Sequence, residues 1–176
     1  MGGEVTQLIL VDRPELVRRT ILVGTGPRNG DGGPMRPETA ELFARTYERQ
    51  DEMWLPIMFS PSATSQAAGR EWLERTRARA GDRDVPVSVE TATAHRAAAT
   101  RWSAPVEDRF AYLRDLARPV LVVNGHEDIV IATINSFHLQ QNLPNAQLIL
   151  YPDSGHGAHF QFPHLFVTHA RLFLDA

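Results

Sequence analysis

Short runs of apolar residues, bounded by turn residues, predict three buried strands in this chain. They lie at residues 16–25, 119–123 and 147–151, and a stretch of helical character separates the second run from the third. Short β-branched runs joined through a helix are typical of parallel strands that are buried on both faces. The pattern therefore predicts an α/β fold, in which residues 118–176 form a β-α-β unit.

The other apolar positions follow a helical spacing. Residues 4–11 predict a helix that ends before the first strand. Residues 36–116 carry no strand pattern, and Ser60 followed by Pro61 is typical of a helix cap and first turn. Helices are expected at 36–50, from Ser60 to Gly81, at 88–102 and at 107–116.

An acid and a histidine follow the second and third predicted strands. Asp128 comes after the turn Asn124-Gly125, and His156 lies between two glycines in the loop 151–157. Chemistry in open parallel sheets collects at the carboxyl ends of the strands, so we expect these two side chains to lie close together. A carboxylate that orients an imidazole acting as a general base needs this proximity. The sequence thus predicts an acid–histidine pair, but it places no nucleophile beside it.

Neighbouring residues offer alternatives to this pair. Glu127 is expected to point to the other side of its turn, and Asp153 to bond locally in a Pro-Asp turn. Ser154 precedes His156 by two residues, where the backbone direction does not present its hydroxyl to the imidazole. For His156 itself, the alternative is a turn histidine whose ring bonds to the backbone.

Composition narrows the classes of protein. The 176 residues suffice for one domain with a core, and 43% hydrophobic and 22% charged residues are ordinary for a soluble protein. The net charge of −3 gives no basic surface for nucleic acid. No apolar run is long enough to span a membrane and no signal peptide is visible, so a cytoplasmic location is expected.

Two missing residue types exclude whole classes of site. The chain has no cysteine, which rules out disulfides, thiolate catalysis and cysteine-bound metals. All 18 basic residues are arginine, which rules out a Walker A lysine and a pyridoxal-phosphate Schiff base. A small histidine-rich metal-binding protein stays a remote alternative. Four histidines lie within fourteen residues near the chain end, His156, His159, His164 and His169, and His126 precedes Asp128 by two, but no zinc-binding motif is present. We expect neither a metal nor a cofactor.

The acid and histidine segments resemble the C-terminal part of an α/β-hydrolase. The matching residues are Gly125 to Asp128, the loop Ser154-Gly155-His156-Gly157, and the phrase Pro144 to Leu148 before the last strand. The resemblance implies that the three strands are strands 6, 7 and 8 of that fold, with flanking helices and a helical cap insertion. It divides the chain into a core helix and strand 6 at 1–35, a cap at 36–117, and a core with the acid and histidine loops at 118–176.

The resemblance also extends to the first residues. In the family the nucleophile elbow reads Gly-x-Ser-x-Gly, and Met1 matches the residue after the serine while Gly2 matches the last glycine. The chain is therefore expected to begin just after the nucleophile, with the backbone nitrogen of Met1 at the oxyanion hole. A disordered glycine-rich tail is the alternative.

By resemblance, the implied activity is hydrolysis of an ester, lactone or similar small acyl substrate by a Ser-Asp-His mechanism. His156 would transfer the proton and Asp128 would hold its ring. Since the serine is expected to be missing, the chain alone should be inactive, and a non-catalytic fragment or pseudoenzyme is the alternative. Four cap aromatics are candidates for an apolar pocket, or else form the core of the cap; they are Trp54, Phe59, Trp72 and Trp102.

The edge of the first strand is expected to be bare. Unpaired apolar strand edges favour association between molecules. We therefore expect self-association through residues 20–23, and no nucleic-acid or membrane partner.

Overall fold

Three parallel strands form the centre of the molecule. In this computed structural model, which describes every residue except 34 and 80, the strands are β1 (Thr20–Val23), β2 (Val120–Gly125) and β3 (Ala146–Tyr151). Their order is β1-β2-β3, with Thr20 opposite Val120 and Val120 opposite Ala146. The central strand β2 is buried at every position, which explains why its sequence is a continuous apolar run. The predicted α/β fold with three parallel strands is confirmed.

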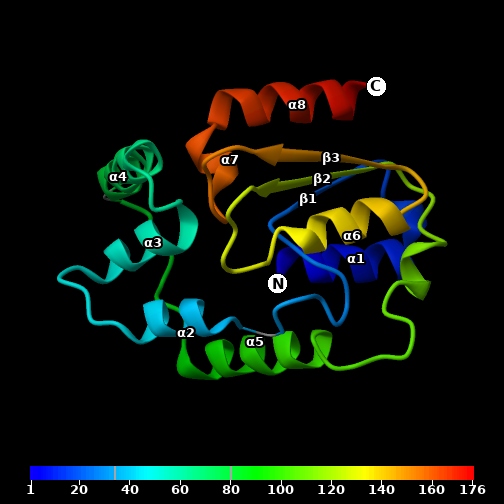
Figure 1. Cartoon of the computed structure of the whole chain (residues 1–176), viewed down its shortest axis with the longest axis horizontal. Coiled ribbons are helices and arrows are strands. Elements are labelled where there is room, and N and C mark those ends of the chain that lie inside the picture. The colour runs from blue at the N-terminus through cyan, green and yellow to red at the C-terminus, as the bar shows by residue number, and fades with distance from the viewer. Residues whose placement is uncertain (34, 80) are drawn as a thin grey trace.

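Helices cover both faces of the sheet. Helices α1 (Gly2–Asp12) and α6 (Ile134–Asn142) lie on one face, and α8 (Pro163–Asp175) lies on the other, as Figure 1 shows. The short helix α7 (Ala158–Gln161) joins the histidine loop to α8. The layering follows from the pleat, because successive side chains of a strand point to opposite faces.

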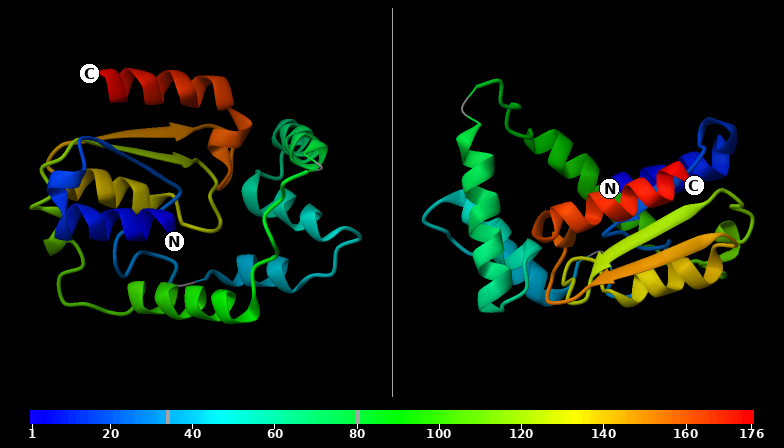
Figure 2. Two further views of the ribbon diagram at one scale, coloured as in Figure 1. Left: turned by 180° about the vertical axis from the view of Figure 1, so that it is seen from behind. Right: turned by 90° about the horizontal axis from the view of Figure 1, so that it is seen from above.

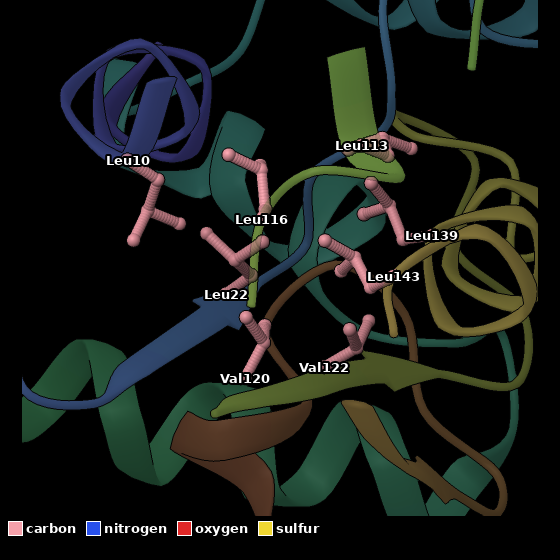
Figure 3. Close-up of a cluster of buried hydrophobic side chains, with 8 residues drawn as sticks. All are labelled: Leu10, Leu22, Leu113, Leu116, Val120, Val122, Leu139 and Leu143. Atoms are coloured by element: carbon pink, nitrogen blue, oxygen red, sulfur yellow. The ribbon is translucent and has the colours of Figure 1, made fainter. Parts of the chain in front are cut away.

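Each face of the sheet has its own apolar cluster. Val120 and Val122 point toward α1 and α6, where they join Leu10 and Leu139 (Figure 3). The intervening residues of β2 point to the α8 side and pack near Phe173. Leu10 is 1% exposed, so α1 is held on the sheet by a fully buried side chain.

A helical region lies beyond the carboxyl ends of the strands (Figures 1 and 2). It comprises α2 (Pro37–Ala44), α3 (Trp54–Met58), α4 (Ala63–Ala78) and α5 (Val89–Trp102). Single 3-10 turns occur at Pro14–Leu16, Gln50–Met53 and Ala111–Leu113. No strand is found between β1 and β2 among the described residues, as the sequence pattern predicts.

Three predicted helix bounds are wrong. The helix expected at 36–50 ends at Ala44, after which Arg45 is extended and the Tyr47 hydroxyl donates back to the Leu42 carbonyl. The stretch 107–116 contains only the 3-10 turn. Helix α4 begins after Ser62, whose hydroxyl accepts from the Ser65 amide, so Ser62 and not Ser60 is the cap.

No helix within the described ranges is both long and apolar enough to cross a bilayer.

Candidate active site

The loop after β2 buries an aspartate, and amides of the same loop donate hydrogen bonds to one of its two carboxylate oxygens. One carboxylate oxygen of Asp128 accepts hydrogen bonds from the amides of Val130 (2.7 Å) and Ile131 (2.9 Å). The side chain is 0% exposed. An aspartate followed by a turn bonds to amides two and three residues on, so this segment needs no distant partner to fix the carboxylate.

The other carboxylate oxygen faces the histidine. His156 Nδ1 lies 2.8 Å from Oδ2 of Asp128, and the His156 side chain is 25% exposed. An ionised carboxylate only accepts hydrogen bonds, so Nδ1 carries the proton and Nε2 is left as an acceptor. Within the described residues, nothing hydrogen-bonds to Nε2. This arrangement leaves the exposed ring nitrogen in position to accept a proton from a neighbouring group.

Backbone hydrogen bonds join the loop that carries Asp128 to the loop that carries His156. The amide of His126 donates to the Tyr151 carbonyl, and the amide of Glu127 donates to the Ser154 carbonyl, each at 2.9 Å. At Gly125 a Cβ would lie 2.1 Å from the Gly155 carbonyl oxygen, so the loops meet where only glycine fits. These contacts set the relative positions of the acid and the histidine.

A glycine after β1 seats the imidazole ring. Gly24 has φ +55°, and a Cβ there would lie 2.8 Å from Cε1 of His156. A side chain at this position would meet the ring and would also strain the backbone. The sequence offers a signal for this role, a glycine directly after a buried strand, but the surrounding Gly-Thr-Gly-Pro run is also typical of an ordinary turn.

The alternative acids and the nearby serine form no hydrogen bond with His156 among the described residues. Glu127 is 47% exposed on the outside of its turn. Asp153 does not bond within its own turn: it accepts from the hydroxyls of Ser60 and Ser62, more than ninety residues away. Ser154 is fully buried and its hydroxyl donates to the Tyr151 carbonyl. Its hydroxyl is thus directed away from His156.

The amino end of α1 packs against the residue that follows Gly24. A Cβ at Gly3 would lie 2.5 Å from the Thr25 side chain, and Thr25 directly follows Gly24. Met1 is exposed, and its terminal amine lies 3.8 Å from Glu4. The neighbouring residues Gly24 and Thr25 therefore contact the His156 ring and the start of α1, respectively.

The four aromatic residues predicted to line a pocket do not gather around one cavity. Trp54 is 38% exposed and packs edge-on against Phe43, whereas Phe59 is buried against Trp72. Trp102 donates its indole N–H to the carbonyl of Pro27 and lines a cavity that also includes Met1. Trp72 lines a separate surface cavity together with Arg75 of α4 and with Arg79 and Arg83, which follow that helix.

A mainly apolar cavity of about 560 Å³ adjoins the acid loop. Phe59 contributes to its wall, together with Ile57 from α3 and Ile129, which directly follows Asp128. Glu38 and Glu127 contribute carboxylates to its lining. Of the four predicted aromatics, Phe59 thus lies nearest to the acid and histidine loops.

The remaining histidines are dispersed. His169 Nδ1 bonds to the Tyr151 hydroxyl at 2.9 Å, and His138 Nε2 lies 3.0 Å from Asp31. His159 packs between Phe160 and Phe166, and burial and the nearby His156 lower its pKa to about 4, so it is neutral at physiological pH. Across the part of the chain that the structure describes, no group of three or more histidine, aspartate or glutamate side chains could hold a metal ion.

Comparison with known proteins gives one curated relative and many solved structures. No model of a known protein family matches the sequence. Over 176 aligned residues, the chain is 29% identical to pimeloyl-[acyl-carrier protein] methyl ester esterase from Nitrosomonas europaea; the alignment covers 96% of this chain and 66% of the esterase. The chain thus spans slightly less than two thirds of the length of this relative.

Two solved structures extend the comparison. Est816, described as an N-acyl homoserine lactone degrading enzyme, is 28% identical with a TM-score of 0.68, over 98% of this chain and 64% of that one. An alpha/beta hydrolase fold protein from Chitinophaga pinensis is 32% identical with a TM-score of 0.88, over 99% of this chain and 62% of that one. Similarity of this extent, in sequence as well as in fold, shows that the chain has the α/β-hydrolase fold.

Proposed function

We propose that this chain carries the acid and the histidine of a serine hydrolase that acts on small esters or lactones. One observation carries the proposal: the 2.8 Å hydrogen bond between His156 Nδ1 and the buried Asp128 carboxylate. This hydrogen bond orients the imidazole so that Nε2 is exposed at the carboxyl ends of the strands, where α/β folds place their active sites.

In the proposed mechanism, Nε2 of His156 removes the proton from an attacking serine hydroxyl. The resulting imidazolium returns the proton to the leaving oxygen, and a water molecule repeats the sequence on the acyl-enzyme. Asp128 holds the ring in the reactive tautomer and stabilises its positive charge, but is not itself protonated. Two hydrogen bonds from backbone amides hold the Asp128 carboxylate in place.

The attacking serine would stand directly ahead of α1, and the backbone nitrogen of Met1 would contribute to the oxyanion hole. The support is the short path from Gly3 through Thr25 and Gly24 to the His156 ring. On this proposal the 176 residues do not include the nucleophile, and we expect them to have no esterase activity alone.

Residues 36–117 would act as a cap that covers the site and shapes the acyl pocket. The apolar cavity beside Phe59 and Ile129 suits an acyl chain, and of the four cap aromatics Phe59 is the best supported as a pocket residue. The ester and lactone substrates in the names of two relatives favour this substrate class.

The first test is the coding DNA ahead of Met1. In-frame codons for Gly-x-Ser directly before Met1 would support the proposal, and an in-frame stop codon would favour a non-catalytic fragment. If the codons are present, the extended chain should hydrolyse a short nitrophenyl ester, and His156→Ala should lower kcat by about a thousandfold or more. Unchanged turnover in that variant would contradict the proposed role of His156.

We also propose that the 176-residue chain self-associates. β1 lies at one edge of the sheet, and α1 exposes apolar side chains beside it. These are Val5, Leu8, Ile9 and Val11. A second copy pairing at this edge would cover both surfaces. Light scattering at increasing protein concentration should show a rising mass, and a constant monomer mass would contradict the proposal.

A further inference from the structure

The corner between α3 and α4 packs against the loop that carries His156 and forms hydrogen bonds with it. This corner, residues 58–65, places the Met58 carbonyl against both glycines that flank His156. The Gly157 amide donates to that carbonyl at 2.7 Å. A Cβ on Gly155 or on Gly157 would lie 3.0 Å from the same oxygen, so neither position has room for a side chain.

Asp153, three residues before His156, holds the corner through both carboxylate oxygens. Oδ1 accepts from the Ser60 hydroxyl at 2.7 Å, and Oδ2 accepts from the Ser62 hydroxyl at 2.8 Å. These two bonds lower the pKa of the Asp153 carboxyl, so it is charged at neutral pH. Ser62 also caps α4, and the positive end of a helix favours a nearby negative charge.

A second set of bonds closes the network from the other end of the loop. The Ser65 hydroxyl donates to Oε1 of Gln161, and Nε2 of Gln161 donates to the Asp153 carbonyl, each at 2.7 Å. The Ser60 amide in turn donates to the Ser65 hydroxyl at 2.9 Å. His156 therefore lies in a loop that the corner fixes at 153, at 157 and at 161.

We propose that Asp153 is a positioning residue through which the α3–α4 corner fixes the His156 ring against Asp128. The ring's bond to Asp128 is its one hydrogen bond within the described residues, so its position depends on how firmly its backbone is held. The catalytic importance of this positioning rests on the proposed function, because a displacement of about 1 Å in a reacting group costs on the order of a hundredfold in rate. The corner is then a fixed wall of the site and not an opening lid.

Histidine-labelled NMR on the chain tests this directly. The exchange of the His156 Nδ1 proton with water reports how well the ring is held. Asp153→Gly removes the side chain without straining the backbone, whose φ of +46° suits glycine. We expect this variant to speed the exchange by about tenfold or more, since both charge-assisted bonds are lost. Asp153→Asn, which keeps two polar ends, should restore most of the protection.

Two further variants keep the result interpretable. Asp82→Gly is the matched control, because Asp82 has a similar φ of +52° on an exposed turn, and it should leave the exchange unchanged. Ser60→Ala removes one of the two hydrogen bonds without altering the histidine loop, and we expect it to speed the exchange by about threefold. This variant provides the test if Asp153→Gly does not fold. Exchange in the folded Asp153→Gly or Ser60→Ala chain that equals the wild type would overturn the inference.

The reference variant Asp128→Asn separates the two proposals. It should change the His156 Nδ1 signal directly, because the ring loses its ionised acceptor. If it does not, the acid–histidine pair fails and with it the proposed function. If it does, while the Asp153 and Ser60 variants have no effect, the positioning role alone is wrong.

Discussion

Replacing Gly125 with alanine should separate the acid loop from the histidine loop. A Cβ there would lie 2.1 Å from the Gly155 carbonyl oxygen and 2.4 Å from the Ser154 carbonyl oxygen. Ordinary contact begins at 3.4 Å, so the histidine loop must withdraw by about 1.3 Å, the difference between 3.4 and 2.1 Å. Both obstructing atoms belong to the backbone and cannot rotate away.

The cost follows from the bonds that this displacement weakens. Ser154 and Tyr151 each accept a 2.9 Å hydrogen bond from the acid loop, and each such bond contributes about 1 kcal/mol. Overpacking adds roughly another 1 kcal/mol or more. We therefore expect a loss of about 3 kcal/mol in the free energy of unfolding, or roughly 6–12 °C in Tm for a chain of this length.

Tryptophan fluorescence during urea unfolding, at low protein concentration, measures this loss. Gly81→Ala is the control, because a Cβ at Gly81 has no atom within 4 Å, and it should lie within about 0.5 kcal/mol of the wild type. The His156 Nδ1 proton should also exchange faster in Gly125→Ala. A Gly125→Ala chain as stable as the control would refute the argument from close backbone approach.

Three other outcomes are expected. Leu139→Ala should lower the free energy of unfolding by about 2–5 kcal/mol in urea, because Leu139 is 0% exposed, whereas Phe137→Ala on the same helix, at 47% exposed, should cost far less. Tyr112→Phe should cost about 1–3 kcal/mol in the same assay, because its hydroxyl donates to Oε1 of the fully buried Gln7; a neutral result would mean that water replaces it. The hydrogen bond from Arg77 lowers the pKa of Asp51 to about 2, so the stabilisation is complete above the ordinary value of 3.8 and is lost as pH falls toward 2. The Tm difference between wild type and Asp51→Asn should shrink over that range, and a constant difference would contradict the pairing.

The strands and the acid–histidine pair were accessible from sequence because both depend on local pattern. β2 is buried on both faces and its sequence is uniformly apolar, and parallel strands bring the residues that follow them to one edge. The position of Asp128 then needs only the turn that follows the strand. The family resemblance extended this reading to the fold as a whole.

The helical region was less predictable because distant contacts decide it. Ser60 has the sequence of a helix cap, but its hydroxyl donates to Asp153, 93 residues away, and Ser62 caps α4 instead. The expected helix at 36–50 ends early, where Tyr47 folds back on Leu42. Gly24 looked like one turn glycine among several, since only the folded chain brings the His156 ring against it.

Asp128 and His156 differ in the sequence distance to the residues that hold them in place. The carboxylate of Asp128 is satisfied by amides two and three residues away, a loop that closes quickly and at little entropic cost. The loop that carries His156 is held by Met58 and Ser60, whose contacts enclose about a hundred residues, so we expect them to form later in folding. Native-state hydrogen exchange should therefore find the Gly157 amide opening while the Val130 amide is still protected.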